Sequence, residues 1–182
     1  MEFFKVIKKR QTVRKFKKKE IPQTKLNKII DAARIAPSAM NEQSWHFVVV
    51  KNKKSRKKIR QWYDEAREKF GGYKQDTSFV ENGTIVLPFY EKKACAPEVS
   101  AALATENLIL AATALGLQCV YMVAPLWHKP NIGRLKKITN IPKKYEPLCV
   151  VIVGYPEGKH KKKPKKKLSE IMSVDKFKGK KD

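Results

Sequence analysis

Apolar side chains recur at helical spacing in five stretches of the chain, at residues 3–10, 22–36, 53–70, 97–116 and 132–138. Pro22 and Pro97 stand where two of these helices begin, a position that proline favours. Gly116 stands where the longest helix ends and is predicted to cap it in a left-handed conformation. The helix at 53–70 is highly charged, so we expect it on the surface.

Four shorter apolar runs predict strands at residues 45–50, 85–90, 119–123 and 148–153. Pro88 interrupts the second run and cannot donate to a sheet ladder, which favours an edge position or a bend for that strand. The fourth run is continuously apolar, which is typical of a central strand. Helices and strands in this order predict an α+β fold.

The length of 182 residues predicts a single domain, 1–182, with enough core to fold without disulfide or metal staples. From Glu157 onward hydrophobicity falls, so residues 157–182 are predicted to form an extended basic C-terminal arm. Leu168, Ile171 and Met172 are expected to anchor this arm.

The chain carries 41 Lys and Arg against 17 Asp and Glu, a formal net charge of +24. Three stretches hold 27 of the 41 cations: nine lie in 5–19, seven in 51–60 and eleven in 159–181. Such clusters attract nucleic acid, anionic lipid or phosphorylated cofactors, or they form a lysine-rich surface that keeps the protein in solution. Because no recognition motif accompanies them, we favour the last interpretation for most of these lysines.

Three widely spaced cysteines without a C-x-x-C pair predict neither a disulfide framework nor a zinc site. Together with the lack of a signal-peptide pattern at Met1, they favour the cytoplasm. The apolar segment 99–117 is interrupted by polar residues and is interpreted as a buried helix, with no membrane span. Its apolar surface is consistent with a dimer interface or with the core of a monomer, and the two alternatives stay open.

Common phosphate-loop, dinucleotide, zinc-protease and hydrolase signatures are absent from the sequence. Arg10 and Arg14, separated by Gln11 and Thr12, provide guanidinium and neutral donors that suit an anion such as a phosphate. Arginines at helix ends are also often solvated or ion-paired. The loop from Pro37 to Asn41 precedes a strand and is a second candidate site, or simply a turn that ends a helix.

Four segments carry a specific resemblance. The run from Arg10 to Phe16 resembles the R-R-S-x-R-x-F opening of nitroreductase-family flavoproteins, with Gln and Thr in place of the commoner Arg and Ser. Residues 33–45 resemble their A-x-x-A-P-S-x-x-N-x-Q-x-W segment. Residues 101–117 are similar to their A-x-x-N-L-x-L-A-A-x-A-L-G-L helix, and residues 151–156 to their strand ending in G-Y-P.

The resemblance implies a three-layer fold with a central mixed or antiparallel sheet, and a homodimer with FMN between its subunits. It implies that the flavin phosphate and ribityl chain are held by Arg10, Gln11, Thr12 and Arg14. It places three further contacts in the other subunit: Pro37, Ser38 and Asn41. In the arm, Lys165 is the best match to a basic residue that reaches the phosphate, with Lys163 second.

One segment departs from the family pattern. Where this chain has Val123 and Ala124, family members usually place a glycine beside the flavin ring. A β-branched valine is expected to narrow the approach to the ring and to restrict the backbone angles.

The predicted function is that of an FMN-dependent oxidoreductase. Electrons would pass from NADH or NADPH through the flavin to a small acceptor, a nitroaromatic or quinone, by a ping-pong mechanism. No catalytic side chain is predicted, although Arg14 is a candidate to stabilise the reduced flavin. The alternatives are a basic nucleic-acid-binding protein and an enzyme of the same fold with specialised flavin chemistry, such as dehalogenation or flavin fragmentation.

Overall fold

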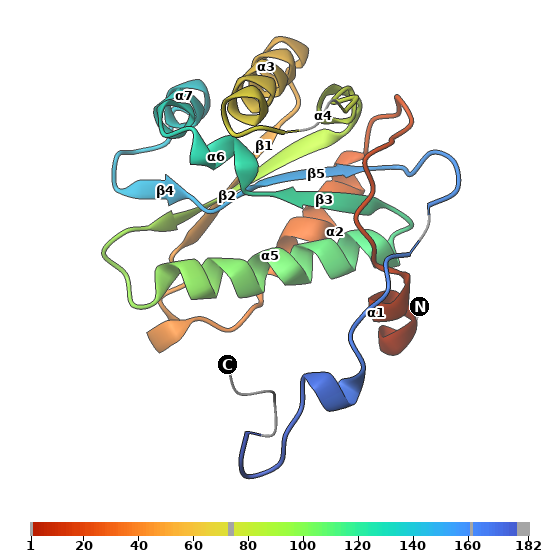
Figure 1. Cartoon of the computed structure of the whole chain (residues 1–182). Helices are drawn as coiled ribbons and strands as arrows, with labels where there is room; N and C mark the ends of the chain where they lie inside the picture. The colour runs from red at the N-terminus through yellow and green to blue at the C-terminus, as the bar shows by residue number, and fades with distance from the viewer. Residues whose placement is uncertain (1, 73–74, 161, 178–182) are drawn as a thin grey trace.

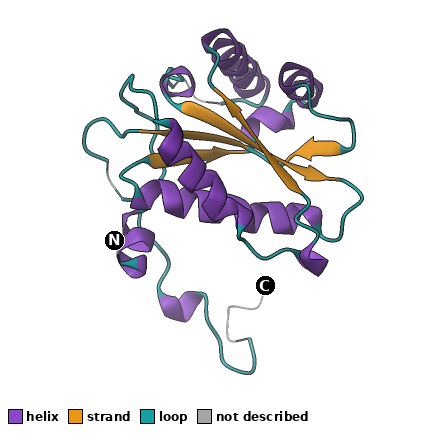
Figure 2. Cartoon of the chain, turned by 180° about the vertical axis from the view of Figure 1, so that it is seen from behind, coloured by secondary structure: helices purple, strands orange, loops and turns teal. Residues whose placement is uncertain are grey.

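The computed structural model describes residues 2–72, 75–160 and 162–177. A five-stranded sheet lies between two layers of helices (Figures 1 and 2). The strands are β1 Trp45–Val50, β2 Thr84–Glu91, β3 Gln118–Met122, β4 Tyr145–Pro147 and β5 Val150–Gly154. The helices are α1 Phe3–Lys9, α2 Gln23–Arg34, α3 Lys53–Lys69, α4 Phe79–Asn82, α5 Pro97–Ala114, α6 Ala124–Trp127 and α7 Pro130–Thr139, with 3-10 turns η1 Ala39–Asn41 and η2 Leu168–Glu170.

The predicted α+β class is confirmed. Each of the five predicted helices and four predicted strands is present within a few residues of its expected bounds. The sheet order is β1-β2-β5-β3, with β4 paired to β2, and all pairings between named strands are antiparallel. Helices α2 and α5 cover one face, and α3, α4, α6 and α7 cover the other (Figure 1). The predicted cap is also present, because Gly116 has φ +80°.

The predicted edge position of the strand around Pro88 is wrong, because β2 lies inside the sheet between β1 and β5. β2 pairs with β5 up to Val86 and with β4 from Phe89 onward. Pro88 lies between these two ladders, and its carbonyl accepts a hydrogen bond from the Leu148 N–H at 2.9 Å. Its missing N–H therefore faces the gap between β4 and β5, where no ladder bond is lost.

The core consists of two apolar layers, one on each face of the sheet. Along β5, Val150 and Ile152 join the layer under α3, while Val151 and Val153 join the layer under α2 and α5. This alternation follows from the two-residue period of a strand. Because helices cover both faces, the strand is apolar at every position, as the sequence predicted.

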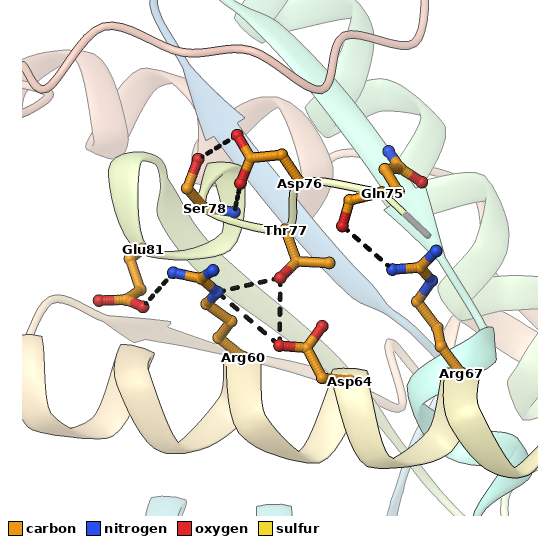
Figure 3. Close-up of polar contacts among 8 residues, drawn as sticks. All are labelled: Arg60, Asp64, Arg67, Gln75, Asp76, Thr77, Ser78 and Glu81. Atoms are coloured by element: carbon orange, nitrogen blue, oxygen red, sulfur yellow. Dashed lines mark hydrogen bonds and ion pairs between the residues drawn. The ribbon is translucent and has the colours of Figure 1, made fainter. Parts of the chain in front are cut away.

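A polar network ties the segment before α4 to α3 (Figure 3). Arg60 of α3 donates to the Thr77 hydroxyl and to the Glu81 carboxylate, both at 2.9 Å. The buried Thr77 hydroxyl in turn donates to the Asp64 carboxylate at 3.1 Å. Beside it, the backbone N–H and hydroxyl of Ser78 donate to Asp76 and lower the pKa of that carboxyl group. One guanidinium thus connects α3 with α4, the next helix along the chain, and with the segment between them.

We expect Arg60→Ala to reduce the free energy of unfolding by about 1–3 kcal/mol, because Thr77 and Glu81 lose a charged partner. Arg34→Ala is the matched control, since Arg34 forms an exposed pair with Asp31 and should contribute less than about 0.5 kcal/mol. Urea denaturation followed by circular dichroism measures both. Equal losses in the two variants would show that the network adds nothing beyond a surface ion pair.

In the part of the chain that the structure describes, no helix combines the length and apolar character that crossing a bilayer requires.

Candidate functional site

A pocket of about 520 Å³ opens between the segment that follows α1 and the C-terminal arm. Its walls bring together the basic stretches at the two ends of the sequence. The lining residues are Ile7, Lys8, Arg10, Gln11, Thr12, Arg14, Lys162, Lys163 and Lys165. All four predicted contacts from the first motif and both predicted lysines of the arm therefore line one cavity.

The backbone of this first motif is held against the edge of the sheet. Arg10 caps the C-terminal end of α1, and its N–H donates to the Val6 carbonyl at 2.9 Å. Thr12 then forms a parallel bridge with Cys119 of β3. The buried side chain of Gln118 accepts a hydrogen bond from the Gln11 N–H at 3.2 Å and donates to the Lys9 carbonyl at 3.3 Å. β3 thereby sets the position from which Arg10 and Arg14 project.

Phe16 anchors the other end of the motif. Its ring is 1% exposed and packs against Gly154, where an added Cβ would lie 2.8 Å from the ring carbons. Phe16 also bridges Pro156 in the backbone. The phenylalanine of the first motif and the glycine of the G-Y-P motif therefore depend on each other, since only glycine leaves room for the ring.

The loop with Pro37, Ser38 and Asn41 lies at a different place. It rests on the first turn of α5, where the Ala39 N–H donates to the Ser100 hydroxyl at 3.2 Å. Helix α1, whose residues Ile7 and Lys8 line the basic pocket, lies by the opposite end of α5 (Figures 1 and 2). With 18 residues, α5 is about 27 Å long. A single chain does not bring the two predicted sets of contacts together.

The loop itself has an unusual backbone. Met40, Asn41 and Gln43 have φ values of 52°, 54° and 48°, which L-residues seldom adopt. The Ser38 hydroxyl stabilises this conformation by accepting a hydrogen bond from the Gln43 N–H at 3.0 Å. The Met40 side chain is 83% exposed. The loop is thus preformed and presents its tip to solvent.

Two polar groups by the basic pocket bear on what it can hold. The Gln11 Oε1 atom is buried and has no hydrogen-bond partner within the described residues, so it would gain from a donor such as a hydroxyl group. On α5, burial raises the pKa of Glu106, and the neighbouring Arg10 opposes that rise. The cations of the pocket fit the phosphate of FMN, and the unused acceptor on Gln11 fits a hydroxyl group of the ribityl chain.

The chain matches the sequence profile of the Nitroreductase family over residues 7–155. The chain belongs to the nitroreductase family. It is 30% identical over 162 residues to a Methanothermobacter thermautotrophicus protein named "Putative NADH dehydrogenase/NAD(P)H nitroreductase", covering 86% of this chain and 78% of the relative.

Two further proteins are similar over nearly the whole chain. An iodotyrosine deiodinase from Thermotoga neapolitana is 30% identical over 173 residues, which cover 87% of this chain and 90% of that protein. A crystal structure of oxidised iodotyrosine deiodinase bound to FMN and 3-iodo-L-tyrosine superposes with a TM-score of 0.86 at 27% identity, covering 97% of this chain and 100% of that one.

In this nitroreductase-family chain, the backbone at Val123 does not require a glycine. Val123 has φ −104° and ψ −20°, an ordinary conformation for a branched residue, and it caps α6. Val123 is 39% exposed, and Ala124 packs partly against the core. Gln118 and Val123 are five residues apart, about 17 Å along an extended strand. The edge of β3 therefore leads from the basic pocket toward Val123.

Two thiols close to this edge are not candidates for chemistry. Burial raises the pKa of both the Cys119 and the Cys149 thiol well above the usual range. Tyr121, which is hydrogen-bonded to Cys149, has its pKa raised to about 12, chiefly by burial. At neutral pH these groups stay protonated, so neither sulfur acts as a nucleophile.

Sequence reasoning missed several residues of the site. Lys8 and Lys162 line the pocket, but as members of long lysine runs they gave no signal of their own. Gln118 was also missed, although an amide at the start of an apolar strand is a detectable anomaly. A buried polar side chain in such a run needs a partner, and here the partners are the backbone of Lys9 and Gln11.

Proposed function

We propose that this protein is an FMN-dependent oxidoreductase that takes electrons from NADH or NADPH and passes them to a small acceptor. The observation that carries the proposal is the basic pocket, where charge for a phosphate and an unused acceptor, Gln11, meet in one cavity. The predicted cations that supply this charge are Arg10, Arg14, Lys163 and Lys165. The volume of the pocket lies in the range typical of cofactor sites.

Each side chain has a distinct part in this proposal. The guanidinium groups of Arg10 and Arg14 would bind phosphate oxygens as planar forks, and the lysines of the arm would add charge from the opposite wall. Gln11 and Thr12 would hold the ribityl hydroxyls. When bound, FMN would supply the redox chemistry, exchanging electrons with the nicotinamide and then with a nitroaromatic or quinone in ping-pong order.

The proposed active unit is a homodimer. Helix α5 carries large apolar side chains on its outer side, where Val99 is 63% and Leu103 45% exposed. The predicted anchors of the arm, Leu168, Ile171 and Met172, are also exposed, so within a single chain that prediction is wrong, because no described part of the same chain covers them. A second copy would cover these apolar faces and would bring its Ser38–Asn41 loop toward the pocket of the first.

The absorbance spectrum of the purified protein tests the cofactor directly. We expect a yellow protein with the flavin bands of FMN, which bleach on anaerobic addition of NADH or NADPH and return when a quinone or nitroaromatic is added. The dinucleotide that bleaches the bands at the lower concentration is the donor. A colourless protein that does not take up added FMN would contradict the proposal.

Reductive dehalogenation is a second candidate, favoured by the similarity to the iodotyrosine deiodinases. In this reaction the carbon–iodine bond breaks, iodide leaves, and two electrons and a proton form the carbon–hydrogen bond. Release of iodide from 3-iodo-L-tyrosine by the dithionite-reduced, FMN-loaded protein would support it. Reoxidation by quinones but not by iodotyrosine would leave the general oxidoreductase as the function.

A further inference from the structure

A second basic pocket lies apart from the first and shares no residue with it. Its volume is about 350 Å³, and three chain segments build it. The segment before α2 contributes Lys18 and Lys19, the first turn of α3 contributes Lys53 and Arg56, and the segment from α4 to β2 contributes Asn82 and Thr84. Two of the three basic stretches of the sequence therefore meet at this cavity.

The charges of this pocket are not balanced within the described chain. Two carboxylates, Glu20 and Glu81, also line it, but Glu81 already accepts a hydrogen bond from Arg60 at 2.9 Å. None of the four lining cations forms a salt bridge with a described residue. Like charges gathered around one cavity repel each other, so a bound anion would stabilise the arrangement.

Two of the cations are held in place. Arg56 Nη1 donates to the Gly83 carbonyl at 2.8 Å, and its Nε is buried without a hydrogen-bond partner among the described residues. Gly83 is packed so closely that an added Cβ would overlap the Ile152 side chain, which fixes that carbonyl. The Lys19 ammonium lies 4.9 Å from the centroid of the Tyr155 ring, a cation–π contact. Arg56 and Lys19 are thus preorganised, and Arg56 keeps one donor that no described group satisfies.

We propose that this second pocket binds a compact polyphosphate, either free pyrophosphate or tripolyphosphate or the phosphate chain of a nucleotide. Several cations around one cavity suit an ion that carries several charges on neighbouring phosphoryl groups. Asn82 and Thr84 add neutral hydrogen-bonding groups. The small volume favours such a ligand over a nucleic-acid backbone, which needs an extended basic surface. The site adds a binding activity that the FMN proposal does not contain.

Isothermal titration of the FMN-saturated protein with tripolyphosphate and with ATP at 150 mM salt tests this inference. We expect one site per chain, and at least tenfold weaker binding in Lys18→Gln/Lys53→Gln, which loses two of the four lining cations. The matched control is Lys54→Gln/Lys57→Gln, which removes two exposed charges from the same helix outside the pocket and should change affinity less than twofold. Tighter binding of ATP than of tripolyphosphate would identify the nucleotide as the source.

Two further measurements distinguish binding in this pocket from binding in the first pocket and from diffuse attraction to the +24 surface. Arg10→Gln/Arg14→Gln, which alters only the first pocket, should bind tripolyphosphate as the parent protein does. Equal weakening in the Lys18/Lys53 and Lys54/Lys57 variants would overturn the proposal, because it would mean that the charge acts without a defined site. A twelve-nucleotide DNA that binds more tightly than tripolyphosphate, and that is weakened equally in the Lys18/Lys53 and Lys54/Lys57 variants, would overturn the proposal in favour of a nucleic-acid surface.

Discussion

Arg10→Ala/Arg14→Ala is expected to give a folded protein that no longer retains FMN through gel filtration. Both guanidinium groups line the basic pocket, and a charge-assisted contact to phosphate contributes about 1.5–3 kcal/mol. Loss of both should raise the Kd for FMN by roughly two to four orders of magnitude. Flavin absorbance after gel filtration and a fluorescence titration with FMN measure the change.

The matched control for this variant is Lys28→Ala/Arg34→Ala, which removes two cations from the exposed side of α2. It should retain FMN, since the lost charges lie outside the pocket. Equal retention of FMN by the two double variants would mean that the phosphate lies elsewhere.

The Arg10→Ala/Arg14→Ala variant also tests whether the flavin lies between subunits. It can be co-expressed with a differently tagged Ser38→Ala/Asn41→Ala chain, and the mixed dimer purified through both tags. Suppose that each FMN site takes the basic pocket from one chain and the loop from the other. One site of the mixed dimer then combines the altered pocket with the altered loop, and the other site combines the intact pocket with the intact loop. The mixed dimer should therefore hold one tightly bound FMN, while both parental dimers bind weakly. Weak binding in the mixed dimer would place both sets of contacts within one subunit.

Phe16→Ala is expected to reduce the free energy of unfolding by about 3–5 kcal/mol, the usual cost of removing a buried aromatic ring from a packed core. The ring fills the space that Gly154 leaves open, so its loss creates a cavity and frees the segment that carries Arg14. FMN retention should fall as well, because the guanidinium groups would no longer be held in place. Urea denaturation, with and without FMN, measures both effects.

Phe177→Ala is the control, since that ring is 78% exposed and its removal should cost less than about 1 kcal/mol. A similar small loss for Phe16→Ala would show that the segment is held by its backbone pairing with β3 and Pro156 alone.

Much of the fold follows from local patterns. The 3.6-residue period located the helices, and continuous apolar runs located the strands, because side-chain periodicity directly reflects backbone geometry. Pro88 shows the limit of this reasoning. Whether a proline costs a ladder bond depends on what lies opposite it, and the gap between β4 and β5 comes from a chain segment 60 residues further on.

The candidate site was predicted residue by residue from a resemblance, and the structure brings the first motif and the lysines of the arm together in one pocket. Arg10 and Lys165 are 155 positions apart in the sequence, yet they line one pocket because the arm returns past α1. Gln118 contacts the backbone of Gln11, and the charge of Arg10 acts on Glu106. Motif matching could not identify either residue, because their roles depend on neighbours distant in sequence.

By itself the sequence determined the element types, the α+β class, the family motifs and the residues of the first motif that line the basic pocket, all of which depend on local order along the chain. Only the tertiary structure decided which basic stretches share a cavity, that Phe16 requires Gly154, and that the Ser38 loop lies at the far end of α5 from the pocket. These facts depend on how strands pair and helices pack, and such non-local contacts leave no periodic trace in the sequence.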